Sequence, residues 1–273
     1  MLRKIWSAAW RICALLLIWG ALLAPFLIPF SRPSQLNVEL ATATTLFISA
    51  WIMRRLVERQ PLVSLGFTSR HFLRDSAIGL SLGIAMMTIC VAFVLELGFA
   101  RALPAVSPSV SAVALGAVAM LVNTFTQELL VRGYMQQTLN SVFGTAASIF
   151  ASAVLFVLLH AGVVKSLLPA VNLFLAGMLL GLAYATTGNL WLPIALHFGW
   201  NFTQEFLGLV ITGHALFSGW RTLVLEGPAI ITGGDFGIEG GLPATAVTAA
   251  GIALVWIVFG RRYSARQMAS AAP

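Results

Sequence analysis

Four polar side chains lie on one stretch of an otherwise apolar segment, and their types suit acid–base chemistry. The stretch begins at Asn123, ends at Arg132, and carries Gln127 and Glu128 between them. Glu128 and Arg132 are four residues apart with the acid first, the order that favours an ion pair on one helix face. Asn123 and Gln127 form a second polar pair with the same spacing. A charged side chain at mid-membrane costs about 3 kcal/mol, so we expect this stripe to face a polar interior.

Two later segments each carry a histidine at the same spacing from a partner. Phe156 precedes His160 by four residues, and His197 precedes Asn201 by four. A carboxylate, two imidazoles and an amide can activate water and stabilise an oxyanion. A histidine in a membrane helix also often makes only an interhelical hydrogen bond, worth on the order of 1 kcal/mol. Two histidines and Glu128 could instead hold zinc with a water as fourth ligand, although no H-E-x-x-H motif is present.

The order and spacing of these motifs resemble the CPBP family of intramembrane proteases, the CAAX prenyl endopeptidase and bacteriocin-processing (Abi) group. That family is marked by E-E-x-x-x-R, F-x-x-x-H and H-x-x-x-N/D on successive helices, and the similarity covers residues 108–212. It implies a metal-free site without cofactors, in which the first Glu and the first His activate water. The second His and the Asn would bind the scissile carbonyl. The implied catalytic positions are Gln127, Glu128, His160, His197 and Asn201, with Arg132 and Phe156 in support.

The chain departs from the family pattern at the position of the implied base. Residue 127 is Gln, and an uncharged amide cannot accept a proton as a general base. Glu128 could take over that role, the protein could be a non-proteolytic relative, or Gln127 could be an engineered isostere. Takeover by Glu128 faces a difficulty, since adjacent residues project about 100° apart around a helix. The sequence leaves these three explanations open.

Composition places the elements that carry these motifs in a membrane. Hydrophobic residues make up 59% of the 273 residues and charged residues only 9%, against about 25% charged in soluble domains. The net charge of +7 does not indicate nucleic-acid binding, because ten of the sixteen basic residues cluster in the short segments 3–4, 54–74 and 261–266. Such clusters mark cytoplasmic loops and ends. Cys13 and Cys90 lie in apolar runs and are interpreted as small buried hydrophobes.

Apolar runs separated by turn residues predict an all-α bundle of about eight membrane helices around a polar cavity. We interpret residues 1–273 as a single multi-pass domain, with 108–212 as its catalytic-type core and the glycine-rich residues 213–242 as an outer loop. We counted the depth of each motif in the membrane from the expected inner end of its helix, at about 1.5 Å per residue. Glu128 and His197 would then lie about 12 Å deep and His160 about 25 Å deep, so the motifs would not meet at one depth. The expected spans are 5–30, 37–53, 76–99, 110–132 and beyond, 141–161, 168–185, a segment from about 191, and 244–259.

The sequence thus favours an intramembrane endopeptidase that cleaves a peptide bond near the cytoplasmic face. Its expected partners are a peptide or protein substrate and the lipid bilayer, with no nucleic acid. The resemblance implies a multi-pass protein of the bacterial cytoplasmic membrane, and eight spans would place both termini on the cytoplasmic side. Gln127 keeps open a non-enzymatic immunity or scaffold protein that binds peptides. A small transporter is a further alternative, but the paired broken helices typical of transporters are not evident.

Overall fold

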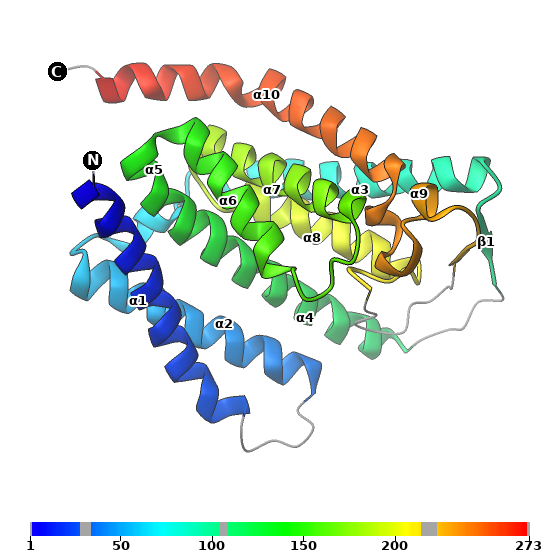
Figure 1. Ribbon diagram of the computed structural model, residues 1–273, viewed down its shortest axis with the longest axis horizontal. Helices are drawn as coiled ribbons and strands as arrows, with labels where there is room; N and C mark the ends of the chain where they lie inside the picture. The colour runs from blue at the N-terminus through cyan, green and yellow to red at the C-terminus, as the bar shows by residue number, and fades with distance from the viewer. Residues whose placement is uncertain (1, 28–33, 104–108, 214–222, 272–273) are drawn as a thin grey trace.

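Helices make up most of the computed structural model, which describes residues 2–27, 34–103, 109–213 and 223–271 (Figure 1). The longer helices are α1 (Leu2–Leu27), α2 (Gln35–Trp51), α3 (Phe72–Glu96), α4 (Val110–Glu128), α5 (Gln137–Phe143), α6 (Thr145–Leu159), α7 (Leu167–Thr187), α8 (Trp191–Phe206) and α10 (Leu242–Ala271). The short elements are the π-helices η1 (Ile52–Val57) and η3 (Leu129–Gln136), the 3₁₀ helices η2 (Leu62–Leu65), η4 (Gly234–Phe236) and η5 (Ile238–Gly240), the helix α9 (Ala229–Thr232), and the strands β1 (Ala100–Ala102) and β2 (Leu223–Leu225).

Six helices within the described residues are long and apolar enough to cross a bilayer, which confirms the all-α, polytopic membrane class. Apolar helices occupy the positions of all eight expected spans, but α6 and α8 have only 15 and 16 residues. A helix of that length covers about 22–24 Å, less than the ~30 Å hydrocarbon core of a bilayer. One end of each short helix is therefore expected to lie at membrane depth, where polar groups must find partners inside the protein.

The fourth expected span continues well beyond Arg132, and this removes the expected mismatch in depth between Glu128 and His160. Residues 110–143 form one continuous helical segment through α4, η3 and α5. The segment ends at Gly144, whose φ of 77° is a backbone conformation that glycine adopts easily, and α6 begins at the next residue. Glu128 and His160 are equally far along the chain from Gly144, on the two arms of a helical hairpin. The expected difference in depth was wrong because the inner end of the fourth helix had been placed too early.

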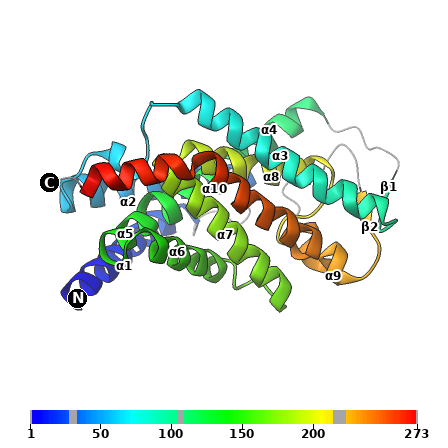
Figure 2. The ribbon, with the colours of Figure 1, turned by 90° about the horizontal axis from the view of Figure 1, so that it is seen from above.

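Close helix packing places α8, which carries the third motif, in the middle of the bundle. α8 contacts α3, α4 and α7, and both views show it among these helices (Figures 1 and 2). Glycines allow α3 and α8 to approach: a Cβ on Gly83 would lie 2.2 Å from the carbonyl oxygen of Leu196, and one on Gly199 would lie 2.7 Å from that of Leu80. Small residues at such crossings let helix backbones come close without relying on apolar side chains. The backbone around His197 is therefore held firmly.

The segment before α10 is folded rather than an extended loop over its described part. β2 pairs antiparallel with β1, with Ala100 opposite Leu225, and so joins the ends of α3 and α8. The three short helices α9, η4 and η5 then follow. Phe236 and Ile238 are buried there among the helices. This packing turns the side chain of Glu239, on η5, toward the interior of the bundle.

Candidate active site

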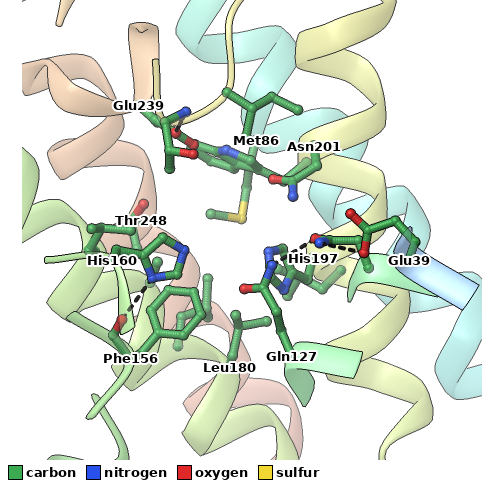
Figure 3. A pocket seen from close by; sticks show the side chains of 18 of the residues that line it. Glu39, Met86, Gln127, Phe156, His160, Leu180, His197, Asn201, Glu239 and Thr248 are labelled. Carbon is green, nitrogen blue, oxygen red and sulfur yellow. Dashed lines mark hydrogen bonds between the residues drawn. The ribbon is translucent and has the colours of Figure 1, made fainter. Parts of the chain in front are cut away.

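A cavity of about 390 Å³ brings together four of the five implied catalytic positions (Figure 3). Gln127 reaches it from α4, His160 from the C-terminal end of α6, and His197 and Asn201 from α8. These residues lie up to 74 positions apart in the chain, so only the tertiary fold makes them neighbours. The fifth position, Glu128, does not line the cavity.

The polar pair Asn123 and Gln127 belongs to a hydrogen-bonded chain that ends on a carboxylate from α2. Gln127 Nε2 donates to Asn123 Oδ1 at 2.7 Å, and Asn123 Nδ2 donates to Glu39 Oε2 at 3.0 Å. Gln35 Nε2 donates to the other carboxylate oxygen at 2.7 Å. The i,i+4 interaction between Asn123 and Gln127 expected from the sequence is thus confirmed. In this arrangement Gln127 Oε1 is left without a partner.

Glu128 faces away from the cavity and supports it from behind. Its carboxylate is fully buried and accepts from Arg132 Nη1 at 2.9 Å, the ion pair expected from the spacing. The same oxygen, Oε1, is 2.8 Å from His197 Nδ1. An ionised carboxylate can only accept, so His197 donates from Nδ1 and keeps Nε2 for the cavity. Glu128 therefore orients an imidazole and is poorly placed to touch a substrate.

Arg132 links this ion pair to the second motif. Its Nη2 donates to the carbonyl oxygen of Gly177 on α7 at 3.2 Å, and its guanidinium lies 4.7 Å from the ring centre of Phe156. Glu128 is the last residue of α4 and Arg132 lies within η3, where the helix widens into π geometry, a feature often found at functional sites. Phe156 also lines the cavity, so the supporting residues hold its wall in place.

His160 ends α6 with its ring turned into the cavity. Its Nδ1 is 2.8 Å from the carbonyl oxygen of Phe156, and since a carbonyl only accepts, Nδ1 donates. A neutral ring then offers Nε2 as an acceptor to a water or substrate in the cavity. Both imidazoles of the site are thus fixed through Nδ1.

Over the part of the chain that the structure describes, no group of three or more His, Cys, Asp or Glu side chains is arranged to hold a metal ion.

Two carboxylates of the cavity wall were not singled out from the sequence. Glu39 comes from α2 and Glu239 from η5, and both line the cavity with the motif residues (Figure 3). A charged side chain inside a membrane span is costly, and this cost drew attention to Glu128. Glu39 also lies inside an apolar span, so the same argument would have identified it. Glu239 carried no such signal, because it belongs to a glycine-rich segment that was expected to lie outside.

Glu239 gives the protein a predicted pH dependence of stability. Burial raises the pKa of Glu239 to about 7 from the ordinary 4.5, although the backbone N–H of Thr212 and the side chain of Trp200 donate to its carboxylate. Between these two values the folded protein holds a proton that the unfolded chain releases. Stability should therefore fall as pH rises from about 4.5 to about 7.

Thermal unfolding of the purified protein in detergent, measured at pH 5, 6, 7 and 8, tests this prediction. The midpoint should drop across the series, and Glu239→Gln should flatten that drop. Glu226→Gln is the matched control. Glu226 is exposed and its pKa is lowered by Arg101, so this variant should keep the drop. Equal slopes in the natural protein and Glu239→Gln would assign the pH dependence to another group.

Comparison with known proteins supports the interpretation of the motif helices. Residues 109–203 match the family model described as type II CAAX prenyl endopeptidase Rce1-like. The match begins just before α4 and ends within α8, so it contains all three motifs. The resemblance inferred from the motifs is thereby confirmed at the level of the family. No curated protein matches the chain.

Proposed function

We propose that the protein is an intramembrane endopeptidase that hydrolyses a peptide bond in the cavity, as the match of residues 109–203 to the Rce1-like model of type II CAAX prenyl endopeptidases suggests. One observation carries this proposal above the others. Two imidazoles, each fixed through Nδ1, and the amide of Asn201 converge on a single cavity. Such a site can hold a water, a peptide carbonyl and the oxyanion that forms between them.

The proposed roles follow from what each side chain can donate or accept. Asn201 Nδ2 is a donor and would bind the scissile carbonyl oxygen, together with His197, whose ring Glu128 orients through Nδ1. His160 Nε2 would accept a hydrogen bond from the attacking water. Gln127 can hold that water with its amide but cannot take its proton. The proton must therefore go to another group of the cavity.

Membrane placement follows from the distribution of basic residues. We propose that the protein spans a bacterial cytoplasmic membrane with both termini inside and receives a peptide segment of a protein substrate. The clusters at residues 3–4, 54–74 and 261–266 would then all lie in the cytoplasm. Within the described chain the cavity is lined by no lysine or arginine.

The second candidate is a non-enzymatic membrane protein that binds peptides in the same cavity. Gln127 favours it, because the side chain at the position of the family's base cannot accept a proton. The polar wall and the cavity volume serve peptide binding as well as hydrolysis. Only a measurement of turnover separates these two functions.

The test is peptide cleavage by the full-length protein in lipid nanodiscs, followed by mass spectrometry of a library of apolar and polar peptides. We expect single-site cleavage, its loss in His160→Ala, and an unchanged rate with a chelator. His71→Asn is the matched control, since His71 lies at the exposed start of α3 and should be dispensable. Peptide binding without cleavage by any form would establish the non-enzymatic function instead.

A further inference from the structure

The cavity retains a carboxylate that can do what Gln127 cannot. We propose that Glu39 of α2 is the general base of this site, an inference that rests on the proposed endopeptidase function. Glu39 lies outside the segment matched by the family model and outside all three motifs. The family pattern places the base on the helix of the first motif, which is α4 in this protein. Here the base would instead come from the neighbouring helix α2, and the substrate would still be a peptide bond.

A hydrogen-bonded chain connects Glu39 to the position of the missing base. Glu39 Oε2 accepts from Asn123, whose Oδ1 in turn accepts from Gln127, so two amides span the distance between the carboxylate and residue 127. All three side chains line the cavity. In Figure 3, Glu39 lies on the same side of the cavity as Gln127, and His160 lies on the opposite side. A water in the cavity can therefore be held between an acceptor on each wall.

Glu39 also differs from Glu128 in its electrostatic environment. Glu39 is buried to 7% exposure, and the ion pairs found among the described residues do not include it. Its hydrogen-bond partners are the neutral amides of Gln35 and Asn123. Glu128, by contrast, is bound to Arg132 and His197. Glu128 is thus engaged in an ion pair behind the cavity wall, whereas Glu39 has neutral partners and lines the cavity.

Glu239 is the other carboxylate in the cavity wall, and its bonding makes it a poorer candidate. Its carboxylate accepts from the backbone N–H of Thr212 at 2.5 Å, and its own backbone oxygen accepts from Asn172. These contacts fasten η5 to the bundle. None of them connects Glu239 to Gln127 or to the helix that carries it. Its side chain is best understood as a structural part of the cavity wall.

The hydrolytic step balances with Glu39 as the only proton carrier. The water oxygen forms a bond to the scissile carbonyl carbon while one water proton passes to a Glu39 carboxylate oxygen. The resulting oxyanion is stabilised by the Asn201 amide. When the oxyanion collapses, the C–N bond breaks and Glu39 returns the proton to the leaving nitrogen. Glu39 ends in its starting charge state, and no metal or other reactant is consumed.

The experiment compares kcat and KM for the cleaved peptide in nanodiscs between pH 5 and 9. Glu39→Gln keeps the size of the side chain and one of its two acceptor oxygens, and Gln35 can turn its amide to accept from the new N–H. The variant should therefore fold but lower kcat by about 10²–10⁴-fold with little change in KM, the range that general acid–base catalysis contributes. A carboxylate base stops working when acid protonates it, so the rate of the natural protein should decline at acidic pH. The residual rate of Glu39→Gln should not show this decline. Glu39→Asp, which keeps a shortened carboxylate, should retain part of the rate and the acidic decline. Glu96→Gln, an exposed carboxylate at the end of α3, should match the natural protein.

Each other outcome has a definite meaning. Full kcat in Glu39→Gln, with cleavage still lost in His160→Ala, would overturn the inference but leave the endopeptidase function intact. Loss of kcat in Glu239→Gln with full rate in Glu39→Gln would assign the base to Glu239. If Glu39→Gln fails to fold, full kcat in Glu39→Asp would overturn the inference, because a shortened carboxylate in the role of the base should keep only part of the rate. Cleavage by no form would overturn both this inference and the proposed function.

Discussion

Gln127→Glu should return peptide cleavage to a protein that carries Glu39→Gln, raising kcat by about 10²–10⁴-fold over the single variant. The double variant moves the carboxylate along the Glu39–Asn123–Gln127 chain to the position where the Rce1-like pattern has it. The new side chain would lie in the same cavity and face the same imidazoles. The measurement is kcat on the peptide cleaved by the natural protein, at a pH above 7 where carboxylates are ionised.

Two further variants make this rescue specific. Asn123→Asp in the same background places a carboxylate one helical turn away on the same wall, and its rescue should be weaker because a shift of this size misplaces the base. Gln127→Glu in the natural background should gain less, since Glu39 is already present. A stable double variant with no gain over Glu39→Gln would show that a carboxylate at 127 cannot act on the substrate, and the family mechanism would not apply here.

Arg132→Met should lower the free energy of unfolding by about 3–5 kcal/mol, the range found when one partner of a buried ion pair is removed. Arg132 and Glu128 are both fully buried, and Arg132 also contacts Gly177 and the ring of Phe156. Methionine has a similar volume, so the main effect is a buried carboxylate left without its guanidinium. Reversible unfolding in mixed detergent micelles measures the change.

Removing the charge of Glu128 as well should recover much of the stability that Arg132→Met loses. The double variant Glu128→Gln/Arg132→Met has no buried charge at this position, and such replacements are often neutral or stabilising. Arg101→Met is the matched control, because the ion pair of Arg101 with Glu226 is exposed and should contribute little. Equal stability of Arg132→Met and the natural protein would show that the ion pair between Arg132 and Glu128 does not stabilise the fold.

The sequence alone determined the membrane class, the approximate positions of the helices and the two polar pairs on the continuous helical segment of α4 and η3. These features depend on local chemistry, since a run of apolar residues must be helical in a bilayer and residues four apart share a helix face. The pairs Glu128–Arg132 and Asn123–Gln127 form as the spacing predicted. The family was also evident, because its motifs are spacings within single helices.

Only the tertiary structure decided which carboxylate faces the cavity. Glu39 meets Asn123 across 84 residues of chain, and Glu128 meets His197 across 69, so neither contact leaves a periodic signal in the sequence. Helix rotation also places the two neighbours at residues 127 and 128 on different sides: adjacent residues project about 100° apart, so α4 turns Gln127 toward the cavity and Glu128 toward His197. The close approach of α8 to α3 then fixes His197 in the position where it meets Glu128.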